Sequence, residues 1–114
     1  MNPLTAVAND LNRLTTELQT AVDYMIEADA DYVEAEHNYV IAKARATQEA
    51  TGTVMQKEAE ILLMTEQERY AAFEAKQLLT ASKARADVIR TRIDVARSLA
   101  ALTRSEVSLS GMYT

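Results

Sequence analysis

The stretch LTAVANDLNRLTTELQTAVDYMIEADADYVEAEHNYVIAKARA, residues 4–46, decides the fold, because apolar residues recur in it at alternating steps of three and four. This heptad pattern has thirteen positions: Leu4, Val7, Leu11, Leu14, Leu18, Ala21, Met25, Ala28, Tyr32, Ala35, Tyr39, Ala42 and Ala46. All thirteen are apolar in a chain that is 48% hydrophobic, a result that chance gives about once in ten thousand trials. A repeat of 3.5 residues per turn predicts a left-handed coiled coil with a partner helix.

Residues on both sides of this run indicate where the first helix begins and ends. Asn2 followed by Pro3 is typical of a helix start, because Asn caps free amides and Pro at the first helical position loses no hydrogen bond. Gly52 suits the left-handed conformation that closes a helix, and Thr53 with Gln56 forms a capping-box pattern that begins another. The sequence therefore predicts two helices joined by a short turn.

These signals predict an all-α fold, a long antiparallel helical hairpin that resembles a coiled coil and forms a single helical domain over residues 1–114. Thr65 with Glu68 repeats the capping-box pattern and indicates an interruption of the second helix. The expected boundaries are a first helix at about 3–50, a turn at 51–53, a second helix at about 54–109 broken near 65, and a frayed tail at 110–114.

The second helix carries two apolar stripes, each with one residue per heptad. One stripe consists of Leu79, Ala86, Ile93, Ala100 and Val107. The other consists of Ala81, Val88, Val95, Leu102 and Leu109. The stripes lie about 150° apart on a helical projection, with Ile89 and Ala96 between them, so one partner helix cannot cover both. We expect a lone hairpin to leave one stripe exposed, and the chain to assemble into a homo-oligomeric helical bundle through these residues.

Charge is distributed unevenly along the chain, whose formal net charge is −5. Residues 1–75 contain five Lys and Arg against fourteen Asp and Glu, whereas residues 76–104 contain seven against two. Five of the basic residues form a row with one residue per heptad, about 40 Å long: Lys76, Lys83, Arg90, Arg97 and Arg104. Arg85 and Arg92 lie elsewhere on the same helix.

Two interpretations of the basic row remain open. Regularly spaced cations can bind the phosphates of a nucleic acid without reading its bases. Alternatively, the row pairs with the acidic first helix and sets the register of the hairpin. A fold about Gly52 predicts these ion pairs: Lys76 with Asp29, Lys83 with Asp23, Arg90 with Glu17 and Arg97 with Asp10.

The sequence lacks the motifs that are typical of hydrolytic or transfer chemistry. The chain has no cysteine, which excludes a Cys–His pair, and no glycine-rich phosphate loop; with His37 as its one histidine, we expect no serine triad. Glu34 and His37 have the Glu-x-x-His spacing of di-iron bundles, but a second such motif is absent and both fall on the outer face of the predicted helix. We therefore expect a non-enzymatic protein with no cofactor, no metal site and no small-molecule substrate.

No apolar run reaches the roughly 18 residues of a membrane helix, and the first residues lack the basic-then-apolar pattern of a signal peptide. These features predict a protein of the cytoplasm, or of the host cell cytoplasm if a phage encodes it, without a membrane partner.

The stretch IRTRIDVARSLAALTR, residues 89–104, closes a layout of a tyrosine-bearing first helix, a Gly turn and a long second helix. This layout resembles small helical proteins of bacteriophages and, among them, the UvsY family of recombination mediators. The resemblance covers about residues 20–104. It implies subunits that assemble into rings, bind single-stranded DNA and help to load a recombinase, with Lys83, Arg85, Arg90, Arg92 and Arg97 as DNA-contacting residues.

Two hypotheses of function follow. The first is an oligomeric mediator that binds single-stranded DNA and a partner protein such as a recombinase. The second is a coiled-coil module that binds only proteins, for example an assembly chaperone, a virion component or an inhibitor of a host factor.

Overall fold

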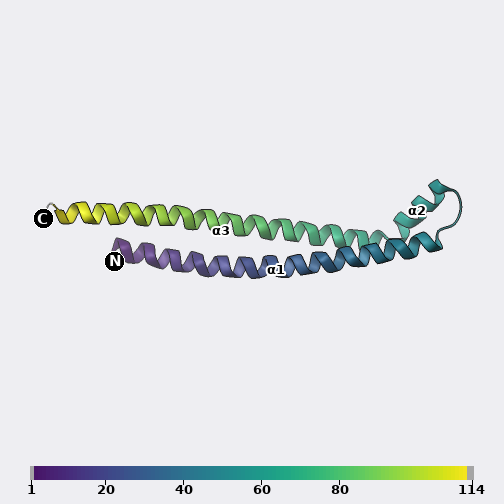
Figure 1. Cartoon of the computed structure of the whole chain (residues 1–114), viewed down its shortest axis with the longest axis horizontal. Coiled ribbons are helices and arrows are strands. Elements are labelled where there is room, and N and C mark those ends of the chain that lie inside the picture. The colour runs from purple at the N-terminus through teal and green to yellow at the C-terminus, as the bar shows by residue number, and fades with distance from the viewer. Residues whose placement is uncertain (1, 113–114) are drawn as a thin grey trace. The chain divides into compact units, whose positions relative to one another are not determined.

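The computed structural model describes residues 2–112. Three helices make up this part of the chain: α1 (Pro3–Glu49), α2 (Val54–Met64) and α3 (Glu66–Met112) (Figure 1). No strand occurs among these residues. The predicted all-α hairpin is confirmed, with α1 as one arm and α2 with α3 as the other.

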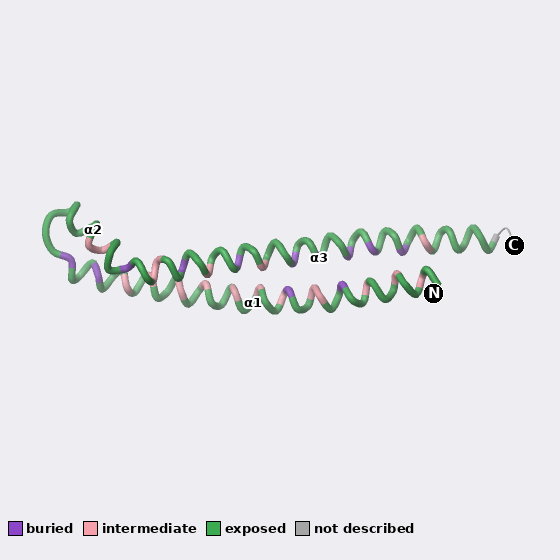
Figure 2. Tube along the Cα trace, turned by 180° about the vertical axis from the view of Figure 1, so that it is seen from behind, coloured by how far each residue is buried: buried purple, intermediate pink, exposed green. Residues whose placement is uncertain are grey.

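The chain groups into two units. Of the described residues, unit 1 contains 2–24 and 83–112, and unit 2 contains 25–82. In unit 1 the first part of α1 packs on the second part of α3. In unit 2 the remainder of α1 lies beside α2 and the first part of α3. Figure 2 shows that the buried residues of each unit lie mostly on the sides of the helices that face each other.

The buried side of α1 is the heptad run quoted above. Each of its thirteen positions is buried or partly buried. Among the other residues of α1, only Glu17 and Val22 are partly buried, and the rest are exposed. The coiled-coil periodicity therefore correctly predicts which face of α1 packs on its partner in both units.

The buried side of α3 follows the same alternation of three and four residues. From Ala72 onward, its ten buried or partly buried positions are Ala72, Ala75, Leu79, Ser82, Ala86, Ile89, Ile93, Ala96, Ala100 and Thr103. We call this set the α3 seam. In unit 1 the core consists of Leu14 and Ala21 of α1 with Ala86, Ile89, Ile93 and Ala96 of α3. Ala86 is 0% exposed, because the small residues let the two backbones approach closely.

The helix start and the turn form as predicted. Asn2 Oδ1 accepts a hydrogen bond of 2.9 Å from the Leu4 amide. Gly52 has φ +104°, in the left-handed region that favours glycine. The Thr53 hydroxyl accepts from the Gln56 amide at 3.2 Å, and the Gln56 side chain accepts from the Thr53 amide at 3.0 Å. This capping box satisfies two amides at the start of α2.

The second arm is broken at Thr65, as expected, but the capping box predicted there is wrong. The buried Thr65 hydroxyl donates a 2.7 Å hydrogen bond to the Ile61 carbonyl, so it is used by the end of α2. The Thr65 amide donates to the same carbonyl at 3.1 Å. Glu68 therefore has no reciprocal partner, and its Oε2 atom is buried without a hydrogen bond.

The end of α3 differs from the expected frayed tail. The helix continues through Ser110 and Gly111 to Met112, whereas residues 113 and 114 lie outside the described part of the chain. Extending an existing helix closes one backbone hydrogen bond for each residue added, and this gain outweighs the low helix propensity of one glycine.

Candidate interaction surface

One of the two predicted stripes of α3 is covered by the chain itself. In unit 1, Ala86, Ile93 and Ala100 are buried and belong to the α3 seam. Val107 is 47% exposed, although we expected it to pack with them. Among residues 66–111 of α3, Thr103 is the last that is buried or partly buried, so Val107 lies past the stretch that α1 covers.

The other stripe is exposed in unit 1. Val88, Val95 and Leu102, which we call the α3 stripe, are between 51% and 61% exposed, and Leu109 continues the line. In unit 2 the same division holds, with Leu79 buried and Ala81 exposed. Burying a Val or Leu completely contributes about 1.5 to 3 kcal/mol, so a partner that covers this half-exposed line would gain hydrophobic free energy.

Few charges border the α3 stripe. At three or four residues from Val88 and Val95, where side chains are neighbours on a helix surface, the charged residues are Arg85 and Arg92. The remaining neighbours there are small or apolar, such as Thr91 and Ser98. At the same distance from Leu102 the charged residue is Glu106, so the border of this stripe on α3 is basic beside Val88 and Val95 and acidic beside Leu102.

Beside Val95 the surface of unit 1 is hollowed. Leu14, Ala96 and Leu99 contribute apolar atoms to this hollow, which has a volume of about 280 Å³. The charged residues that line it are Asp10, Arg13 and Arg92. The α3 stripe is thus an apolar surface with a recess, and its border on α3 is basic beside Val88 and Val95.

Unit 2 carries a second exposed stripe, on α1, that the sequence reasoning missed. Ile26, Val33 and Val40, which we call the α1 stripe, are spaced one heptad apart and are between 58% and 63% exposed. Each directly follows a partly buried heptad residue, and this regular placement was a signal in the sequence. The charged residues three or four positions away are mostly acidic, in particular Asp23, Asp29 and Glu36.

The basic row lies open to solvent. Lys83, Arg90, Arg97 and Arg104 are all exposed in unit 1, and Lys76 is exposed in unit 2. Among the described residues, Arg90 alone of these five forms an ion pair, with Asp87 on its own helix at 3.0 Å. A pair this exposed contributes little, about 0 to 1 kcal/mol, and leaves most of the row free to bind an anion.

The predicted ladder between the row and α1 is absent from residues 2–112. Each of the three ion pairs found in this part of the chain joins two residues of the same helix, two pairs on α1 and one on α3. Arg13 binds both Asp10 and Glu17 on α1, and its hydrogen bond to Asp10 is the main cause that raises the pKa of Arg13. Asp10 and Arg92 line the same hollow, which lies on one flank of the α3 seam. Arg90 and Arg97 lie on the other flank, so Asp10 does not face Arg97 as predicted.

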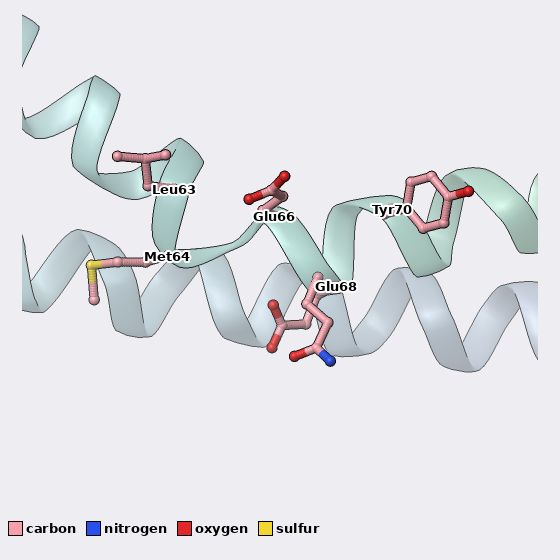
Figure 3. A pocket seen from close by; sticks show the side chains of 6 residues that line it. Leu63, Met64, Glu66, Glu68 and Tyr70 are labelled. Carbon is pink, nitrogen blue, oxygen red and sulfur yellow. The ribbon is translucent and has the colours of Figure 1, made fainter.

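The Glu34 and His37 pair is not part of a metal-binding cluster in the described part of the chain. No group of three or more His, Asp or Glu side chains among residues 2–112 is placed to hold a metal ion, and Glu34 and His37 are exposed. An open hollow lies where α2 meets α3, lined by Leu63, Met64, Glu66, Gln67, Glu68 and Tyr70. In Figure 3, Glu68 extends toward α1 while Glu66 points away from it.

No helix among residues 2–112 combines the length and the apolar character needed to cross a membrane. The chain matches no family model, no curated protein and no solved structure.

Proposed function

We propose that the protein is a non-enzymatic accessory protein that assembles from several copies and binds single-stranded DNA along the basic row. The observation that supports DNA binding is the row itself: exposed cations at heptad spacing with no carboxylate partner on the described part of α1. The exposed α3 stripe supports assembly, because apolar lines of this kind are normally covered by a partner helix.

The spacing of the row suits a flexible phosphate chain. Neighbouring cations are about 10.5 Å apart along the helix, and the four in unit 1 extend over about 31 Å. Such a row binds the backbone and not the bases, so we expect affinity with little sequence preference. In a recombination role, which the resemblance to the UvsY family implies, a recombinase would be the protein partner.

The test is a fluorescence anisotropy titration with a labelled oligo-dT strand. If about four phosphates are neutralised, affinity should fall roughly 50-fold between 50 and 200 mM salt. Arg90→Glu with Arg97→Glu should weaken binding at least about tenfold, because two contacts are lost and two repulsive charges are added.

The matched control is Arg45→Glu with Lys57→Glu, which makes the same change of net charge at exposed positions outside the row. This control should bind within about twofold of the unmodified protein, since the contribution of distant charges is screened. Absence of binding at 50 mM salt, or equal loss in the control, would contradict the proposal.

A second candidate function is a module that binds only proteins. The observation that favours it is the exposed apolar surface of α2, where Val54, Met55 and Leu63 are each at least 74% exposed. Under this alternative the oligo-dT titration shows no binding at any salt concentration.

A further inference from the structure

We infer that the α3 stripe of one copy is covered by the α1 stripe of a second copy of this chain. The inference deepens the proposed function, on which it rests, by naming the two surfaces through which the copies associate. Both stripes consist of exposed aliphatic residues one heptad apart: Val88, Val95 and Leu102 on one side, Ile26, Val33 and Val40 on the other. Two lines with this repeat can pack as the two helices of a coiled coil.

Charge complementarity identifies the partner stripe. Arg85 and Arg92 border the α3 stripe, and Asp29 and Glu36 border the α1 stripe. Each pair of charges is separated by one heptad, about 10.5 Å along its helix, so both opposite-charge contacts can form in a single register. Charges that flank an apolar seam set partner choice and register in this way.

The same charges disfavour the two symmetric alternatives. If two α3 stripes met, Arg85 and Arg92 would face the same arginines of the partner subunit. If two α1 stripes met in parallel register, Asp29 and Glu36 would face the same carboxylates of the partner subunit. The contact is therefore heterologous, with different surfaces on the two copies, and such contacts build rings or filaments.

The inferred contact leaves the basic row available for DNA. On the helical projection of α3, the row lies about 150° from the α3 stripe. Arg85 and Arg92 are thus assigned to subunit contact, whereas Lys83, Arg90, Arg97 and Arg104 remain exposed. Assembly would place several such rows on one particle, which increases avidity for a long strand.

The experiment uses two variants that each block one stripe, Val33→Glu and Val88→Glu, and measures molar mass by light scattering without nucleic acid. Each variant alone should lose the oligomeric mass of the unmodified chain. An equal mixture should form a dimer and nothing larger, because one intact α3 stripe meets one intact α1 stripe. Ala101→Glu, an exposed position off both stripes, should keep the unmodified mass.

Outcomes that overturn the inference are specific. If Val33→Glu keeps the unmodified mass while Val88→Glu loses it, the contact joins two α3 stripes. If both variants keep the oligomeric mass, the stripes do not form the interface. If the unmodified chain has the mass of one copy, the copies do not associate at all. The molar mass is measured without nucleic acid, and DNA binding is measured separately by the oligo-dT titration. A failure of the inferred contact can therefore be distinguished from a failure of DNA binding.

Charge exchange provides a second measurement that does not place a charge within an apolar line. Arg85→Glu with Arg92→Glu, and separately Asp29→Lys with Glu36→Lys, should each lower the oligomeric mass. All four changes in one chain should restore it, because opposite charges again face each other. If both twofold variants have a lower oligomeric mass and the fourfold variant does not regain the mass of the unmodified chain, the inferred pairing is wrong.

Discussion

Gly52 is the residue on which the reversal of the chain depends. Its φ of +104° is a conformation that residues with a Cβ rarely adopt. A Cβ at this position would also contact Gln56 Oε1, the atom that accepts the hydrogen bond from the Thr53 amide. Backbone conformation and capping box are therefore coupled at one residue.

Gly52→Ala should accordingly lower the free energy of unfolding by about 1 to 2 kcal/mol, through backbone strain and a weakened cap. Urea unfolding followed by circular dichroism measures the loss. Gly111→Ala is the matched control, because its Cβ would enter open space within a helix, and it should be neutral or slightly stabilising. Equal unfolding midpoints for the two variants would show that the turn does not depend on glycine.

At the scale of the helices, close packing of small residues joins α1 to α3 in unit 1. Ala21 and Ala86 are almost completely buried in the same core. A larger side chain there has no space unless the helices move apart, which reduces the contacts of the neighbouring Ile89 and Leu14.

Ala86→Leu should therefore destabilise the protein by about 1 to 3 kcal/mol despite adding apolar surface. Ala101→Leu, the same change at an exposed position of the same helix, should leave stability within about 0.5 kcal/mol. Thermal unfolding of both variants at one protein concentration makes the comparison. A stabilising effect of Ala86→Leu would mean that the helices are not in close contact there.

Much of the helix arrangement was predictable from the sequence. The heptad run indicated the correct face of α1, and Gly52 and Thr65 indicated the turn and the break, since these depend on local backbone chemistry. The two α3 stripes have the same repeat and similar apolar content, so the stripes alone do not show which of them packs on α1. The signal for this choice was present in the sequence as Ile89 and Ala96, which complete an alternation of three and four residues with one stripe only.

The ion-pair ladder failed as a prediction for a related reason. Counting residues from the turn estimates which residues face each other along the hairpin, but not on which flank of the seam a side chain lies. Asp10 and Glu17 lie within one helical turn of Arg13, and a partner on the same helix costs less ordering than one across the seam. Sequence alone thus located the charged surfaces but not their partners.

At the scale of the whole molecule, the chain has more apolar surface than its own helices cover. The α3 stripe and the α1 stripe remain exposed after the hairpin forms. Stability and assembly should therefore be linked, since contacts between copies add burial that one copy lacks.

Light scattering over a dilution series, with circular dichroism on the same samples, tests this link most directly. We expect a mass that is a multiple of 12.6 kDa at high concentration, and a loss of helical signal as dilution separates the copies. A particle with the mass of one chain that keeps its full helical signal at the lowest concentration would contradict the dependence of this fold on a second copy.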